Sequence, residues 1–161
     1  MCSSDLSGLF PNDTDSKIVA GRFLYRLEQA LQTLSDVADK DKLIAASLGK
    51  EIVGNLPSSL ELVTLHSNPY KEHTFVLPDM TYSGVIDFGD SYISHPVNDL
   101  RRWSFTERRH LLRGYSSLGD LSDSFMQVWN INYQLDAILD MLRKKLTLSD
   151  IGRTDDLLEW E

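Results

Sequence analysis

The chain has 161 residues, of which 42% are hydrophobic and 25% are charged, a composition typical of one globular domain rather than a disordered or fibrous chain. It carries 24 acidic and 16 basic residues and a formal net charge of −8. We therefore do not expect a nucleic-acid binder, which needs a basic surface to displace counterions. The acidic balance is compatible with a cationic small molecule as substrate, and it also serves ordinary solubility.

The compartment is predicted from what the sequence lacks. Cys2 is the single cysteine, so an internal disulfide is excluded and a reducing, cytoplasmic environment is expected. The first 16 residues are polar and have neither the basic start nor the apolar stretch of a secretory signal. No stretch approaches 18 uninterrupted apolar residues, so we expect no membrane span. We predict a flexible leader over residues 1–15 and one folded region over residues 16–161.

The first predicted elements are two amphipathic helices. One begins after Asp15 or Ser16, either of which can cap it, and extends to about residue 34. The second runs from Asp41 to Val53, and Gly54 is expected to stop it in a left-handed conformation. Apolar residues at three- and four-residue steps predict the buried face of each helix. These inward residues are Ile18, Val19, Phe23, Leu24, Leu27, Leu31, Leu34, Leu43, Ile44, Leu48, Ile52 and Val53.

A short β region follows, and then further helices. Residues 60–65 predict a strand, and residues 74–77 and 82–86 predict a hairpin with a turn at residues 78–80. After Pro96 we predict short helices over 98–105 and 106–115, a long helix over 121–146, and a last short helix capped by Ser149. The fold class is therefore α+β and helix-dominated, with a small central β-hairpin. The inward residues of the long helix are Phe125, Val128, Trp129, Ile131, Leu135, Ile138, Leu139 and Leu142.

Three successive segments of the sequence contain the candidate functional residues. The first to stand out is residues 84–90, Gly-Val-Ile-Asp-Phe-Gly-Asp, in which an apolar strand ends in a carboxylate and a glycine turn. Such a strand end can hold a carboxylate rigidly toward an open cleft, although by itself the pattern is most often a simple turn. Upstream lies His-Ser-Asn-Pro-Tyr-Lys-Glu-His at residues 66–73, and downstream lies His-Pro-Val-Asn-Asp-Leu at residues 95–100.

Together the three segments resemble the aminoglycoside phosphotransferase-like kinases. That family has a loop of the form His-Gly-Asp-Leu-x-Pro, with Tyr-x-Glu-His following in one branch, a strand Gly-Val-Ile-Asp-Phe-Gly-Asp, and a helix start Gly-Asp-Pro-x-x-Asp-Leu. The match is close over about 40 residues, from Leu62 to Trp103. It implies a protein-kinase-like C-terminal lobe. It also implies transfer of a phosphoryl group from ATP to a hydroxyl of a small molecule, with Mg²⁺ and ATP as cofactors.

The resemblance assigns roles residue by residue. Asp87 matches the carboxylate that binds Mg²⁺, and His73 stands at the second ligand position, although imidazole favours softer metals. Asp99 matches an aspartate that braces the catalytic loop through backbone hydrogen bonds. His66 opens that loop, where we expect it to pack and form hydrogen bonds rather than carry a proton. Asp90 is expected to cap the next turn rather than bind the metal directly.

The sequence also departs from the family pattern. Asn68 stands where the family has its catalytic aspartate, and a neutral amide cannot accept a proton from a substrate hydroxyl. Loss of a general base typically costs about 10²–10⁴ in rate. Ser67 replaces a family glycine, and Pro69 favours an extended backbone at the residue before it. We find no glycine-rich strand pair and no strand lysine before the loop, so we expect the N-terminal nucleotide lobe to be absent and ATP binding to be weak.

Three interpretations stay open at this point. The first is a truncated or degenerate kinase, inactive or weak alone. The second is a genuine small-molecule kinase whose N-terminal lobe comes from another chain, with a partner chain or self-association over the exposed lobe face. The third is a non-catalytic binding or scaffold module. In the third case the acidic residues Glu72, Asp87 and Asp90 would hold a metal or a cationic ligand. A transition-metal site formed by His66, His73, His95 and Asp87 is a further variant of this reading.

Overall fold

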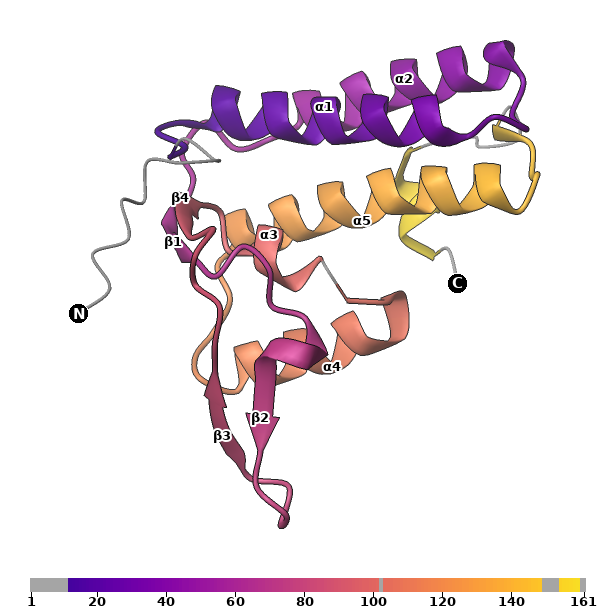
Figure 1. The fold of residues 1–161 in the computed structure, drawn as a ribbon. Helices are drawn as coiled ribbons and strands as arrows, with labels where there is room; N and C mark the ends of the chain where they lie inside the picture. The colour runs from indigo at the N-terminus through magenta and orange to yellow at the C-terminus, as the bar shows by residue number, and fades with distance from the viewer. Residues whose placement is uncertain (1–11, 102, 149–153, 160–161) are drawn as a thin grey trace. The chain divides into compact units, whose positions relative to one another are not determined.

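The structure is a computed structural model that describes residues 12–101, 103–148 and 154–159. The chain divides into two compact units, each described by itself below (Figure 1). The motif unit comprises residues 1–14 and 60–122, and the helical unit comprises residues 15–59 and 123–161. The chain is helix-rich with two small two-stranded sheets, which agrees with the expected α+β class. No helix in the described ranges is long and apolar enough to cross a bilayer.

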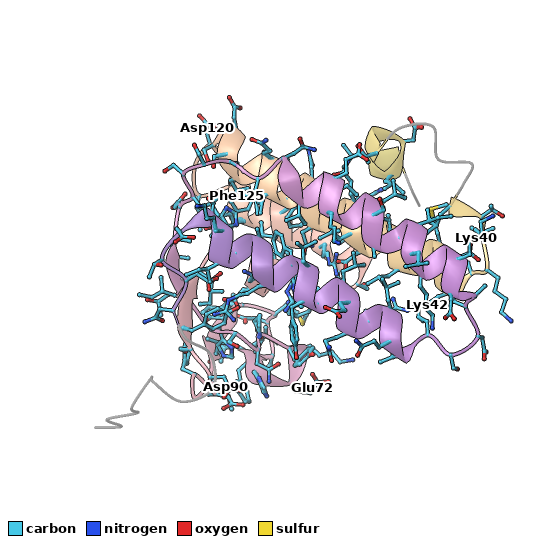
Figure 2. All side chains as sticks on the ribbon, turned by 90° about the horizontal axis from the view of Figure 1, so that it is seen from above. Lys40, Lys42, Glu72, Asp90, Asp120 and Phe125 are labelled. Atoms are coloured by element: carbon cyan, nitrogen blue, oxygen red, sulfur yellow. The ribbon has the colours of Figure 1, made fainter. Side chains whose placement is uncertain are left out.

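The helical unit is built from α1 (Ser16–Thr33), α2 (Asp39–Gly54), α5 (Asp123–Arg143) and the 3₁₀ helix η3 (Thr154–Glu159). Figure 2 shows α1 and α2 side by side, and both helices contact α5. Asp15 is the N-cap of α1, as predicted, because its carboxylate accepts from the N–H groups of Lys17 and Ile18. The predicted cap of the last helix, Ser149, lies outside the described residues.

The core of this unit follows the predicted periodicity on two of its three long helices. The residues of α1 that are buried are Val19, Phe23, Leu27 and Leu31, and all eight inward residues predicted for the long helix are buried in α5. Ile18, also predicted to face inward, is 39% exposed, because it lies in the first turn of α1. Burial of these large apolar side chains is the main favourable term in folding the unit.

The prediction for α2 was wrong in two details. Leu43, predicted to face inward, is 72% exposed, and the buried positions are Ala45, Gly49, Ile52 and Val53. The close packing of α1 explains this orientation, because a Cβ atom on Gly49 would lie 2.2 Å from Cδ2 of Leu27. The helix therefore presents its small residues to α1. Gly54 does not adopt a left-handed conformation either; it ends the helix with a negative φ.

The motif unit contains both sheets. The predicted hairpin is confirmed: β2 (Thr74–Val76) pairs antiparallel with β3 (Tyr82–Val85). The predicted strand at 60–65 is shortened to β1 (Val63–Leu65), and it pairs antiparallel with β4 (Tyr92–Ser94), which we did not predict. A three-residue strand just before a helix start is too short to give a readable alternation.

The helices of this unit are shorter than expected at first and regular afterwards. The predicted helix over 98–105 is a single turn, α3 (Val97–Leu100), preceded by Pro96. It ends early because Ser104 starts the next helix, α4 (Phe105–Ser116), with a capping box in which Ser104 and Glu107 satisfy each other's backbone N–H groups. These hydrogen bonds from Ser104 also lower the pKa of Glu107.

The end of the predicted leader is attached to β4. Asn12 Oδ1 accepts from the N–H of Ile93, and the N–H of Asp13 donates to the Ile93 carbonyl. Residues 1–11 lie outside the described part, so a leader over residues 1–15 stays a prediction.

Candidate active site

Asp99, on α3, holds the backbone of the first motif. Its Oδ2 accepts from the N–H of His66 and its Oδ1 from the N–H of Ser67, both at 2.8 Å. Ser67 has a φ of 77°, a left-handed conformation that L-residues other than glycine, asparagine and aspartate rarely adopt. The two charge-assisted bonds offset the cost of that conformation. This is the geometry that a loop brace requires.

His66 joins the same loop to the end of β3. Its side chain is buried, Nε2 lies 2.6 Å from the carbonyl oxygen of Ile86, and Nδ1 accepts from the N–H of Asn68 at 3.2 Å. A carbonyl can only accept, so the hydrogen of this bond is on Nε2. Both ring nitrogens are engaged with the backbone, and the ring packs against Phe88 with centroids 4.5 Å apart. His66 therefore links the loop to the residue that follows β3.

His73 connects the loop to the carboxylate of the second motif. It ends the 3₁₀ helix η1 (Lys71–His73), and its Nδ1 lies 2.8 Å from the carbonyl oxygen of Asn68. The Nδ1 hydrogen therefore faces that carbonyl, and Nε2 lies 3.5 Å from Asp87 Oδ2. A hydrogen on Nε2, or a cation held between the two atoms, makes this contact favourable.

Asp87 is fixed in its backbone and open at its side chain. It directly follows Ile86, whose N–H donates to the His73 carbonyl at 3.0 Å. Its φ is 70°, a left-handed conformation that aspartate tolerates better than most residues, and its side chain is 57% exposed. The carboxylate is thus held at the end of a strand but remains accessible to solvent, as a ligand for a soluble metal complex must be.

The first two motif segments, residues 66–73 and 84–90, lie next to each other in space. The Asn68 carbonyl, the His73 ring and the Asp87 carboxylate form a continuous series of contacts. It is the backbone of Asn68 that takes part in this series, while its side-chain amide is half-buried in the loop. The segments that provide these groups are about 20 residues apart in sequence and adjacent in space.

The larger metal sites considered above do not form. No group of three or more His, Cys, Asp or Glu side chains within the described ranges is arranged to hold a metal ion. The transition-metal set of His66, His73, His95 and Asp87 was therefore wrong, and so was an acidic metal site made by Glu72, Asp87 and Asp90. His95 is fully buried, which lowers its pKa to about 4 and keeps it neutral. The candidate ligands for a cation are therefore the side chains of His73 and Asp87.

A second layer of buried polar groups supports α3 and was not predicted. Asn98 Nδ2 donates to the hydroxyl of Ser94 at 2.9 Å, and that hydroxyl donates to the buried carboxylate of Asp13. Asn98 directly precedes Asp99, so this series of hydrogen bonds fixes the helix turn that carries the brace. The sequence gives no signal for it, because Asp13 and Ser94 are far apart in the chain.

A large cavity lies elsewhere. It has a volume of about 720 Å³ and is formed by α1 and α2 of the helical unit. None of the predicted site residues lines it. Its lining includes Leu24, Leu27, Leu31, Lys42, Leu43 and Ala46.

Comparison with known proteins gives little further information. No family model matches the chain, and no curated protein matches it. A similar solved structure is the apoenzyme of the macrolide 2′-phosphotransferase MphH from Brachybacterium faecium, with 16% sequence identity and a TM-score of 0.47. The match covers 86% of this chain and 47% of that chain, so this chain spans about half of the other protein's length. The similarity is too distant to assign a fold family or an activity, and the geometry above has to support the function.

Proposed function

We propose that the motif unit is the phosphate-handling part of a small-molecule kinase of the aminoglycoside phosphotransferase type, with impaired transfer. The family reaction moves a phosphoryl group from ATP to a hydroxyl, and the acidic chain suits a cationic substrate. The observation that supports this most is the placement of His73 between the Asn68 carbonyl and the Asp87 carboxylate. Hydrogen bonds between side chains and backbone groups join the three sequence motifs. Asp99 binds the N–H groups of His66 and Ser67, and His66 binds the carbonyl of Ile86.

The residues present fit a divalent cation with few protein ligands. When bound, Mg²⁺ with ATP would supply the positive charge that neutralises the transferring phosphoryl group. Asp87 offers a hard carboxylate oxygen, and the neutral His73 ring offers the lone pair of Nε2. Two protein donors leave most of the coordination to water and phosphate oxygens, as is common for Mg²⁺. We therefore expect the cation to bind weakly without a nucleotide.

Asn68 is the residue that limits the chemistry. Its backbone is held by the His66 and His73 rings, so the loop is ordered even with the substitution. The amide can orient a substrate hydroxyl by a hydrogen bond but cannot take its proton. Because phosphoryl transfer depends mainly on positioning and charge, slow turnover is compatible with this site. The catalytic loss expected from the missing base alone is about 10²–10⁴.

The metal assignment is tested with Mn²⁺, a paramagnetic substitute for Mg²⁺. In the wild-type chain, we expect Mn²⁺ to broaden the amide NMR signals of residues 68, 73 and 87 selectively. Asp87→Asn should weaken the apparent Mn²⁺ affinity by at least about tenfold, because it removes the only carboxylate at the site. Asp90→Asn is the matched control: this carboxylate is exposed in the same turn, and its loss should change the affinity less than about twofold.

Equal effects of the two substitutions would contradict the assignment, since they would indicate non-specific attraction by an acidic surface. Calorimetry with Mg-ATP provides a second readout. Micromolar binding by these 161 residues would contradict the weak nucleotide binding that we expect, because no glycine-rich strand pair and no strand lysine, the groups that hold the phosphates in protein kinases, precede the loop in this sequence.

A binding or scaffold role without transfer is the second candidate. It is favoured by the exposed apolar side chains of the β2–β3 hairpin, next to Asp87. In that case the brace and the two histidines keep a loop in shape for a partner, and no phosphoryl transfer is expected even when Asn68 is replaced by Asp.

A further inference from the structure

The β2–β3 hairpin carries an unusual density of exposed apolar side chains. Five of these residues, Phe75, Val76, Leu77, Met80 and Tyr82, form what we call the apolar hairpin surface. A large apolar side chain typically has a surface area of about 150–250 Å², so a half-exposed one presents on the order of 100 Å² to solvent. Five of them present on the order of 500 Å², which is less than the roughly 800 Å² that each partner contributes to a standard protein interface and suits a weak, reversible one. The residues and their exposures are Phe75 48%, Val76 52%, Leu77 49%, Met80 77% and Tyr82 67%.

The strand edges of the hairpin are also unprotected. The sheet has two strands in the described part of the chain, so the outer N–H and C=O groups of both have no third strand to pair with. Natural proteins usually protect such edges with charged residues, proline or β-bulges. The strands Thr74–Val76 and Tyr82–Val85 contain no charged residue and no proline, and their register shifts once, between Phe75 and Val76. A two-stranded hairpin is marginally stable by itself, and it gains stability when further strands or an apolar layer cover it.

The hairpin is nevertheless well defined in shape. Thr81 donates from both its N–H and its hydroxyl to the Asp79 carboxylate, which lowers the pKa of Asp79 and fixes the turn. Opposite residues include Phe75 with Gly84 and Val76 with Tyr82. Because neighbouring residues of a strand point to opposite faces, apolar side chains lie on both faces of the hairpin. A partner strand that pairs along an edge and extends the sheet would cover apolar side chains on both faces.

We propose that the occupant is a second copy of this chain, with two hairpins pairing edge to edge across a two-fold axis. Identical antiparallel edges are self-complementary, which a two-fold interface requires. Charge favours the same partner: the chain carries −8 overall, but Asp79 is the single charged residue among residues 74–86. The hairpin is thus a place where two acidic copies can meet with little repulsion. Apolar side chains on the same face of the two pairing strands would then pack against each other and become buried.

Analytical ultracentrifugation of the full chain from about 5 to about 500 µM tests this proposal, a range that spans weak and standard-size interfaces. We expect a reversible dimer that persists in high salt. Val76→Lys with Tyr82→Lys should weaken dimerisation at least about tenfold, because it puts a like charge on each strand of the hairpin, whichever edge forms the junction. Leu43→Lys is the matched control, since Leu43 is an equally exposed apolar residue on α2 and lies in the other unit.

A wild-type chain that stays monomeric at the highest concentration would overturn the proposal. So would a dimer that survives the double substitution but is lost in Leu43→Lys, which would place the interface on α2. Amide exchange at His66 and Ser67 reports whether each variant keeps its fold. If the double variant unfolds, Ser83→Lys puts one charge on the exposed edge strand, and unchanged dimerisation of that folded variant counts against edge pairing.

Discussion

Replacing Asp99 by Asn is expected to destabilise the motif unit by about 2–3 kcal/mol, because hydrogen bonds to a charged group contribute about 1.5–3 kcal/mol each. The carboxylate accepts from two backbone N–H groups, those of His66 and Ser67. An amide keeps one acceptor oxygen and turns its NH₂ group toward the other N–H. At least one bond and the full negative charge are lost, and the left-handed Ser67 loses its support.

Chemical denaturation and amide hydrogen exchange measure this effect. In Asp99→Asn we expect the N–H groups of residues 66 and 67 to exchange at least about tenfold faster than in the wild type, as a local loss of about 1.4 kcal/mol already gives a factor of ten. Asp120→Asn is the control, because Asp120 is an exposed carboxylate of the same unit. Unchanged protection of the two amides in Asp99→Asn would show that α3 does not hold the loop.

The largest stability effect is expected in the helical unit, from Phe23→Ala. Phe23 is fully buried on α1, and the Arg26 guanidinium carbon lies 4.6 Å from the centre of its ring. Truncating a buried phenylalanine removes its transfer free energy and leaves a cavity, which together cost about 3–5 kcal/mol. The cation–π contact with Arg26 is lost as well.

Tyr25→Ala is the matched control for that substitution, because Tyr25 is an aromatic residue on the same helix with 62% of its surface exposed. Its truncation should change the free energy of unfolding by about 0.5 kcal/mol or less. Urea denaturation followed by far-UV circular dichroism compares the two variants. Similar losses for Phe23 and Tyr25 would contradict the burial pattern of α1.

The helices show which parts of a fold local patterns can predict. The inward faces of α1 and α5 follow directly from apolar residues at three- and four-residue steps, since each helix buries one continuous stripe. The orientation of α2 does not follow, because it depends on the contact between Gly49 and Leu27 on another helix. A glycine inside a helix normally destabilises that helix, whereas Gly49 allows α2 to pack closely against Leu27 of α1.

Local sequence patterns also predicted only part of the candidate site. The motif at residues 84–90 was enough to predict that the carboxylate of Asp87 is presented just after a strand. The tautomers of the two histidines could not be predicted, because they depend on which backbone carbonyl each ring nitrogen meets. The support given by Asp13 through Ser94 was also invisible, since nothing in either segment indicates the other.

Long-range ¹H–¹⁵N NMR correlations of the histidine rings test the central claim, that the two motif segments meet at His66 and His73. At a pH of about 8, where imidazoles are ordinarily neutral, we expect His66 to carry its hydrogen on Nε2 and His73 on Nδ1. Each ring is assigned by its own His→Gln variant. A spectrum in which His73 is protonated on Nε2, or averages rapidly between tautomers, would mean that the ring does not connect Asn68 with Asp87.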